Sequence, residues 1–295
     1  MMKFIANLFL LFTLLFIISC NADVDTPIET VKLCNNSSNI CSKKYNETVF
    51  ACTHNAYNYP TEPSNFLLPN QSQSIQQQLN SGVRALMLDL YYANDNENIL
   101  LYHGTSLAGA NNLKNELEVI ANFLKDNPTE ILTIILESYI EFANFEKAIE
   151  QNGLLPFLYY PQATGEWPIL QNMIDSNQRL VILSDVKDEN AAPWYIYVWD
   201  VAFETHYSNN SQADFSCNTN RGDSNNDLFI FNHFITHSVL GTGVFDSSAV
   251  INQYNYLLNR FQECQAYHNK LPNFITVDFH DIGNVIEVVN YLNDL

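Results

Sequence analysis

Six polar side chains lie at or near the ends of apolar runs that are typical of β-strands. They comprise two imidazoles, one amide and three carboxylates, which are groups that move protons or bind cations. An imidazole titrates near neutral pH, so a pair of them suits general acid and base catalysis. One such residue alone is more often structural, for example as a helix cap. Six of them buried at one place would be costly without partners or a role. The six are His54, Asn55, Asp89, His103, Glu137 and Asp278.

The apolar runs that carry these residues predict seven strands. The clearest run is Ile131–Glu137, which is rich in β-branched residues and is typical of a strand buried on both faces. We expect the polar residues to follow or end these strands. The predicted strands are Thr48–Thr53, Val83–Tyr91, Ile99–His103, Ile131–Glu137, Leu180–Ser184, Leu228–Asn232 and Phe274–Phe279.

Helical patterns separate the strands. One apolar stripe runs from Leu113 to Leu124, and Asn127-Pro128 ends that helix. Two further stripes consist of Ile251, Tyr254, Leu258 and Phe261, and of Val285, Val288, Val289 and Leu292.

The alternation of strands and helices over roughly 250 residues predicts a parallel α/β fold, either a closed barrel or a doubly wound sheet. The chain has only 9 glycines, and no GxGxxG motif follows a strand, which disfavours a dinucleotide-binding sheet. We therefore expect an irregular barrel. Catalytic groups of such barrels lie at the carboxyl ends of the strands, so the six polar residues would meet at one rim.

The first residues are typical of an export signal. Met1–Ser19 is apolar apart from a few residues, carries one lysine, and is too short for a comfortable membrane span. A small residue followed by Cys20 resembles the lipobox of bacterial lipoproteins, and ordinary signal cleavage nearby is the alternative. We predict a signal peptide of the lipoprotein type at 1–20, an N-terminal segment at 21–45 and a barrel at 46–295.

Five cysteines follow Cys20, and none has the spacing of a structural zinc site. In an exported chain we expect a short disulfide loop between Cys34 and Cys41 and a long one between Cys217 and Cys264. Cys52 would remain as a buried thiol.

The charge is strongly acidic, with 13 basic and 32 acidic residues and a net charge of −19. Such a chain repels nucleic acid and anionic membranes at long range, which argues against a nucleic-acid partner. A phosphate-bearing substrate would need positive charge supplied locally by the site.

Four segments of the chain together resemble the X region of phosphatidylinositol-specific phospholipases C. The likeness is greatest to the secreted phospholipase-C-like phosphodiesterases of plants, fungi and bacteria, and it covers most of Cys34–Leu295. The ordered set His-Asn, Asp, His-Gly and Glu is specific, whereas any one member would not be. The segments are Thr53–Tyr57, Gly82–Asp89, Tyr102–Gly104 and Ile131–Tyr139.

The resemblance implies a distorted (β/α)8 TIM-type barrel that cleaves the phosphodiester between diacylglycerol and inositol. By position, His54 matches the histidine that deprotonates the inositol 2-hydroxyl, and His103 matches the one that protonates the leaving oxygen. Asp278 matches an aspartate that orients the first histidine. The implied partner is a phospholipid or a soluble phosphodiester, with peripheral contact to a membrane.

The resemblance implies one of two sources of positive charge for the phosphate. Metal-independent bacterial members have an arginine at the position of Asp89, which this chain lacks, so we expect a divalent cation, calcium. Calcium-dependent members place Asn, Glu, Asp and Glu around the metal, and this chain has Asn55, Met87, Asp89 and Glu137 there. Three oxygen ligands remain, because a hard cation does not use a thioether. We therefore expect a weak metal site at Asn55, Asp89 and Glu137.

Two further residues are predicted to bind substrate, Lys187 after the strand Leu180–Ser184 and His233 after Asn232, although a solvated lysine and a structural histidine are equally reasonable. Arg221 is expected to end a loop, and it is the next candidate for phosphate charge if no metal binds.

Two other readings compete with a phospholipase-C-type lyase or hydrolase. A glycerophosphodiesterase or sphingomyelinase-D-like enzyme would use a related barrel, usually with more carboxylates. A surface barrel that lost catalysis through Met87 would bind a glycan or a partner, but it would need neither His54 nor His103.

Overall fold

The computed structural model describes residues 32–60, 66–93, 98–236 and 243–295. The predicted signal peptide at 1–20, its Cys20 and the first part of the 21–45 segment lie outside the described residues.

The core of the described chain is a curled sheet of eight parallel strands, with order β7-β6-β5-β2-β1-β11-β10-β8. Among the described residues no ladder joins β7 to β8, so the barrel is open at that point. The predicted distorted α/β barrel is confirmed. The strands are β1 (Phe50–Thr53), β2 (Ala85–Tyr92), β5 (Leu132–Ser138), β6 (Leu180–Ser184), β7 (Tyr195–Tyr197), β8 (Ala202–Thr205), β10 (Leu228–Asn232) and β11 (Phe274–Val277).

One predicted barrel strand has a different place. The run Ile99–His103 was expected to be a parallel strand, but β3 (Ile99–Leu101) pairs antiparallel with β2, with Leu101 opposite Leu90. The connection after β2 is too short for the helical crossover that a parallel neighbour needs, so the chain turns back as a hairpin. Because β3 runs back toward the barrel, His103 still returns to the rim. Two more strands extend the sheet, β4 (Asn111–Asn112) on β3 and β9 (Thr219–Gly222) on β8.

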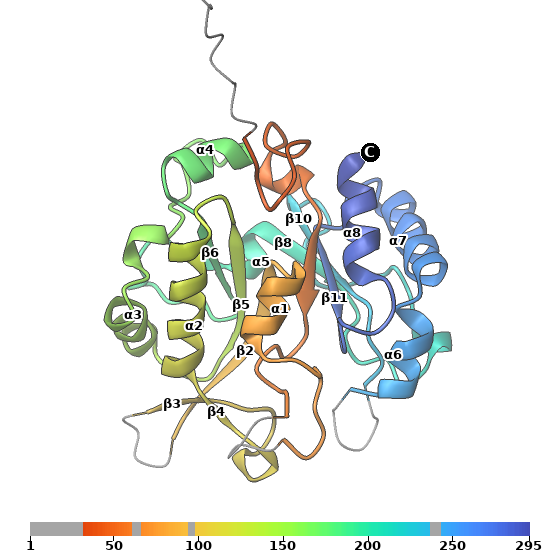
Figure 1. The fold of residues 1–295 in the computed structure, drawn as a ribbon, viewed down its shortest axis with the longest axis horizontal. Helices are drawn as coiled ribbons and strands as arrows, with labels where there is room; N and C mark the ends of the chain where they lie inside the picture. Colours follow the sequence, from red (N-terminus) through yellow and green to blue (C-terminus); the bar gives the residue numbers. More distant parts are fainter. Residues whose placement is uncertain (1–31, 61–65, 94–97, 237–242) are drawn as a thin grey trace, which may run out of the picture. The chain divides into compact units, whose positions relative to one another are not determined.

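Helices pack on the outside of this sheet, with α1, α2 and α8 in front of it in Figure 1. The predicted helices at 113–124 and 285–292 are confirmed, whereas the stripe from Ile251 to Phe261 is divided between two helices at Asn252-Gln253. The helices are α1 (Ile75–Ser81), α2 (Leu113–Asp126), α3 (Phe142–Gln151), α4 (Leu170–Asp175), α5 (Val198–Val201), α6 (Phe245–Ile251), α7 (Tyr254–His268) and α8 (Val285–Asp294), with 3-10 turns at Tyr45–Glu47, Ser106–Ala108, Leu155–Phe157 and Gln212–Asp214. Within the described part, no helix is both long and apolar enough to cross a bilayer.

Two apolar clusters form the interior. The larger lies between the sheet and its helices, and the smaller includes Tyr45, Phe50, Phe274 and other residues of the opposite strand face. The Tyr45 hydroxyl is hydrogen-bonded to the Thr133 hydroxyl at 2.6 Å, which satisfies both buried groups. The smaller cluster therefore fills the interior of the barrel.

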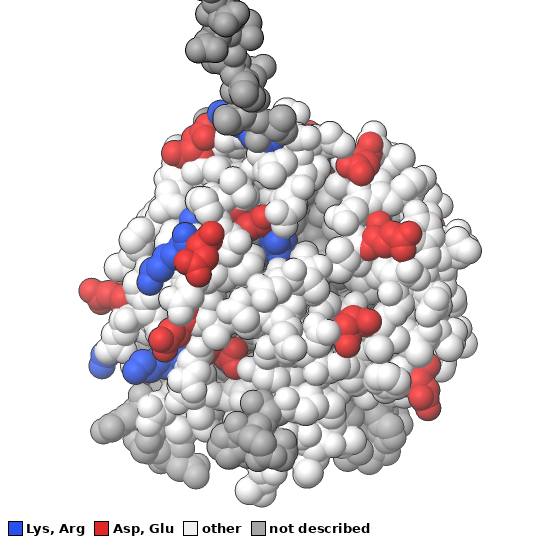
Figure 2. Space-filling model, in the orientation of Figure 1, with Lys and Arg blue, Asp and Glu red and all other residues white. Residues whose placement is uncertain are grey.

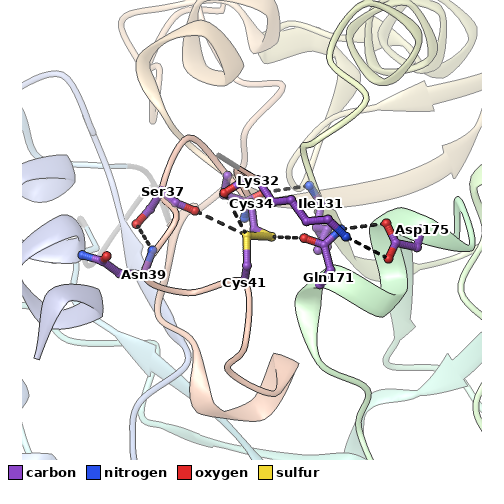
Figure 3. The surroundings of a disulfide bond; sticks show 9 residues. Lys32, Cys34, Ser37, Asn39, Cys41, Ile131, Gln171 and Asp175 are labelled. Atoms are coloured by element: carbon purple, nitrogen blue, oxygen red, sulfur yellow. Dashed lines mark hydrogen bonds and ion pairs between the residues drawn. A yellow bond between two sulfur atoms is a disulfide. The ribbon is translucent and has the colours of Figure 1, made fainter. Parts of the chain in front are cut away.

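Both predicted disulfides are present, Cys34–Cys41 and Cys217–Cys264, and Cys52 is a buried free thiol. Figure 3 shows the short disulfide loop beside Gln171 and Asp175 of α4. The backbone amide of Gln171 donates to the carbonyl of Cys41 at 3.0 Å, so this loop is fastened to the barrel.

We expect the two disulfides to differ in their effect on stability. Cys217–Cys264 spans 47 residues and Cys34–Cys41 spans 7. Loop closure in the unfolded chain predicts that double replacement by alanine lowers the free energy of unfolding by about 4 kcal/mol for the long loop and about 2 kcal/mol for the short one. Urea unfolding followed by circular dichroism measures both, and Cys52→Ala serves as the control without a disulfide. Equal losses in the two double variants would contradict this account.

Candidate active site

A cavity of about 410 Å³ opens at the carboxyl ends of the parallel strands. Five of the six predicted polar residues line it, and Asp278 lies behind one of them. Its floor includes Ile135 and Ile230 of the smaller apolar cluster, and Met87 packs against that cluster. The lining polar residues from the prediction are His54, Asn55, Asp89, His103 and Glu137.

His54 and Asp278 form a hydrogen-bonded pair between neighbouring strands. β1 ends at Thr53 opposite Val277 of β11, so the next residue of each strand meets the other, and His54 Nδ1 lies 2.9 Å from Asp278 Oδ1. The Asp278 side chain is fully buried and that of His54 is 17% exposed. The His54 ring also stacks on Phe234, with centroids 3.9 Å apart. The imidazole is therefore fixed at Nδ1 and on one face, which leaves Nε2 for a substrate.

Two neighbouring amides hold this pair in place. The Asn70 amide donates to Asp278 Oδ1 at 3.0 Å and accepts from the Asn58 amide at 2.6 Å. The Gln71 amide donates to the backbone carbonyls of His54 and Val277 at 2.9 and 3.0 Å. Sequence reasoning missed Asn70 and Gln71, because an isolated polar pair in a loop gives no periodic signal.

His103 forms a second imidazole–carboxylate pair. Its Nδ1 lies 3.1 Å from Asp89 Oδ2, and its side chain is 39% exposed against 6% for Asp89. The hydrogen bond to Asp89 raises the pKa of His103 above its ordinary value, although burial opposes this. His103 therefore carries a proton over a wider pH range than a free imidazole and suits the role of a general acid.

Glu137 lies beside Asp89, because the two residues are register partners on β5 and β2. Burial raises the pKa of Glu137, and the charge of Asp89 raises it further. The Tyr139 hydroxyl donates to Glu137. Tyr139 stacks on Tyr91 at 4.3 Å, and Tyr91 stacks on Tyr102 at 4.1 Å, so one aromatic stack joins the segments that carry Glu137 and His103.

The three residues predicted to hold calcium lie in the same cavity. Asn55, Asp89 and Glu137 all line the cavity and carry oxygen atoms that can bind a hard cation; burial raises the pKa of Glu137, and the charge of Asp89 adds to this rise. Within the described ranges, however, no three His, Cys, Asp or Glu side chains are grouped to hold one ion. A cation would have two carboxylates and one amide as ligands from these positions, because the thioether of Met87, which also lines the cavity, does not bind a hard cation.

The structure does not bring Lys187 or His233 to the cavity. Lys187 is exposed and pairs with Asp200 at 2.7 Å. His233 is buried between the Ile251 carbonyl and Arg260, at 3.0 Å from each. Burial, together with the charge of Arg260, lowers the pKa of His233 to about 3, so the ring is neutral and structural.

The cavity contains charged residues that sequence reasoning left out or set aside, namely Asp185, Glu204 and Arg221. Arg221 was expected to end a loop, but it lies in β9, and its Nε donates to Glu204 at 2.6 Å. β9 is exposed on both faces and has no apolar alternation, so its sequence gives no strand signal.

Comparison with known proteins identifies the family of the chain. The family model PI-PLC X matches residues 40–293, so the chain belongs to the PI-PLC X domain family. A PI-PLC X domain-containing protein of Arabidopsis thaliana is 30% identical over 280 residues, covering 84% of this chain and 62% of that protein. An uncharacterized secreted protein of Arthroderma benhamiae is 25% identical, covering 85% of this chain and 61% of its own length. The chain thus spans about three fifths of the length of these two relatives.

A solved structure supports the fold. A mutant of the phosphatidylinositol-specific phospholipase C from Staphylococcus aureus superposes with a TM-score of 0.58 at 12% identity, covering 86% of this chain and 93% of that one. At this identity the likeness concerns the fold alone.

We expect the titration of His103 to depend on Asp89. In Asp89→Asn the hydrogen bond to a carboxylate is lost, so the pKa of His103 should fall from its raised value. NMR titration of the imidazole protons measures the midpoint, and Glu189→Gln, an exposed carboxylate change, should leave it unaltered. An unchanged midpoint in Asp89→Asn would show that the two side chains do not pair in solution.

Proposed function

We propose that this protein is a phosphodiesterase that cleaves a phosphodiester by general acid and base catalysis from two histidines. The observation that carries the proposal is the pair of imidazoles on one cavity, each bound through Nδ1 to a buried carboxylate. In both rings Nε2 is left to exchange a proton with the substrate. A barrel that only binds a ligand has no need for two such pairs.

The roles of the histidines follow from their surroundings. His54 acts as the base toward a substrate hydroxyl, and Asp278 stabilises the imidazolium that forms. His103, whose pKa is raised by Asp89, donates a proton to the departing oxygen. The hydroxyl of an inositol-type head group would provide the nucleophile, which gives the lyase reaction of the phospholipase C type.

A divalent cation, calcium, is part of the proposal, held weakly by Asn55, Asp89 and Glu137. When bound, it supplies Lewis-acid polarisation of the phosphate. The chain's own carboxylates have a second effect, since Asp89 orients His103 and Glu137 holds Tyr139 at the mouth of the cavity.

We also propose that the protein is exported, as the name of its secreted fungal relative suggests. The two disulfides support this, because disulfides persist in oxidising compartments. Its substrate would be a phospholipid or a soluble phosphodiester. Membrane contact and lipid attachment at Cys20 stay predictions.

The histidine roles can be tested by replacement. His54→Ala and His103→Ala should each lower turnover by roughly 10²- to 10⁴-fold, the usual contribution of a general acid or base. Fluorogenic inositol phosphodiesters and glycerophosphodiesters are the substrates, and the preferred one separates a phospholipase C type from a glycerophosphodiesterase. His268→Gln, on α7 and away from the cavity, is the control. Wild-type turnover in either active-site variant would remove the mechanism.

The cation can be tested by binding and by turnover. Exhaustive EDTA treatment should lower turnover, and calcium should restore it. Isothermal titration calorimetry should show weak calcium binding that tightens by about tenfold in Met87→Glu, because affinity rises with the charge of the ligands. Met87→Gln controls for polarity without charge. Full turnover in EDTA, or no gain in Met87→Glu, would contradict a metal at these residues.

A further inference from the structure

The cavity has a surplus of negative charge for a site that binds a phosphodiester. Among its described lining residues, four are carboxylates and one is a guanidinium. The chain as a whole has a net charge of −19, and Figure 2 shows acidic side chains scattered over a mostly uncharged face. Attraction for an anion therefore has to arise inside the cavity. The four carboxylates are Asp89, Glu137, Asp185 and Glu204, and the guanidinium is Arg221.

Arg221 is positioned by an irregular pairing between β8 and β9. Phe203 pairs with Gly222 and Thr205 pairs with Thr219, so Glu204 alone stands opposite two residues, Asn220 and Arg221. Such a bulge redirects side chains at the edge of a sheet. The bulge directs both side chains to the same acceptor: the Asn220 amide and Arg221 Nε donate to Glu204 Oε1 at 2.8 and 2.6 Å.

Gly222 allows this approach. Its φ of +78° lies in the left-handed region, and a Cβ there would lie 2.2 Å from the Ala202 carbonyl oxygen. The run Asn220-Arg221-Gly222 thus has a structural reason for each residue type.

Two aromatic rings also contact the guanidinium. Its central carbon lies 4.5 Å from the Trp199 ring centroid and 4.8 Å from that of Tyr207, and both rings line the cavity. Glu204 is buried and takes a further hydrogen bond from the Asn232 amide at 3.0 Å, so it cannot move away. Although burial lowers it, the hydrogen bond to Glu204 raises the pKa of Arg221 overall, so the charge is permanent.

The two terminal nitrogens of Arg221 are available to a ligand. Only Nε is engaged by a hydrogen bond within the described residues, and the side chain is 41% exposed. Other arginines of the described chain are committed to structure. Arg84 pairs with Glu130, Arg179 caps backbone carbonyls, and Arg260 contacts His233.

From this geometry we propose that Arg221 is the phosphate-binding residue of the cavity, holding two non-bridging oxygens of the scissile phosphodiester through Nη1 and Nη2. A guanidinium presents two parallel N–H groups that match a phosphate, and stacking on Trp199 and Tyr207 reduces the entropy lost on binding. The assignment rests on the proposed phosphodiesterase function. Arg221 would bind the anionic phosphodiester group of the substrate, and this contact does not depend on the head group.

Replacing Arg221 tests the assignment. Arg221→Met removes the guanidinium and keeps a side chain of similar length. Arg221→Lys keeps the positive charge but replaces the guanidinium by a single ammonium group. Glu204→Gln/Arg221→Met avoids a buried unpaired carboxylate where the single variant fails to fold. Lys125→Met, an exposed charge loss on α2, is the matched control.

The first readout is binding of inorganic phosphate and of inositol 1-phosphate, measured by calorimetry. We expect Arg221→Met and the double variant to weaken both by about 10- to 100-fold, Arg221→Lys by less, and Lys125→Met not at all. The second readout is turnover of diesters with and without an additional phosphate on the head group. Loss confined to substrates with the additional phosphate would overturn the scissile assignment and place Arg221 at the head group.

The experiments distinguish a failure of the Arg221 assignment from a failure of the proposed phosphodiesterase function. Wild-type turnover and phosphate affinity in the folded Arg221 variants would overturn the role of Arg221 and leave the phosphodiesterase intact. Phosphate binding that depends on Arg221, in a wild-type protein that cleaves no diester, would support the binding site and reject the activity.

Discussion

The parallel pairing of β1 with β11 is the constraint on which the site depends. It joins the first strand of the barrel to the last and brings His54 within 2.9 Å of Asp278, 224 residues later in the chain. The buried Asp278 carboxylate would be costly if the strands shifted by one residue, because it would lose both His54 and Asn70. The register of the strands and the geometry of the His54–Asp278 pair are therefore stabilised by the same contacts, and the Gln71 amide reinforces them by donating to the carbonyls at both strand ends.

Much of this arrangement follows from the sequence. Apolar runs that are rich in β-branched residues predict the strands, and the His, Asp or Glu at their ends predict a site at the carboxyl ends of the strands. The features that the sequence did not predict also have physical reasons. The direction of Ile99–Leu101 depended on a connection too short for a crossover, which periodicity does not reveal. β7, β8 and β9 were not predicted, and β9 is exposed along its whole length and has no apolar alternation. Arg221 was expected to end a loop and was only the next candidate for phosphate charge, because β9 has no apolar alternation; the structure places it in a bulge opposite Glu204, in the lining of the cavity.

Carboxylates in this cavity act in two opposing ways. The hydrogen bond to Asp89 raises the pKa of His103, which suits the proposed general acid, but the charge of Asp89 also adds to the rise in the pKa of Glu137 that burial causes, and it repels a phosphate. Asp185 adds to this, with a pKa raised by burial and lowered in part by Arg221. The same acidic groups that favour proton donation therefore increase the need for positive charge.

One guanidinium does not balance four carboxylates, so the proposed roles of Arg221 and of a divalent cation are compatible. Arg221 is tied to Glu204 on the β8 and β9 side, whereas Asp89 and Glu137 lie on β2 and β5. A phosphodiester held between them would meet a cation on each side, with both imidazoles beside it. Met87 then affects the charge of the cavity as well as its affinity for a metal. A thioether in place of the carboxylate that the resemblance implies would weaken the proposed metal site, but it would also remove one negative charge from the cavity, so a smaller positive charge would be enough to admit a phosphodiester.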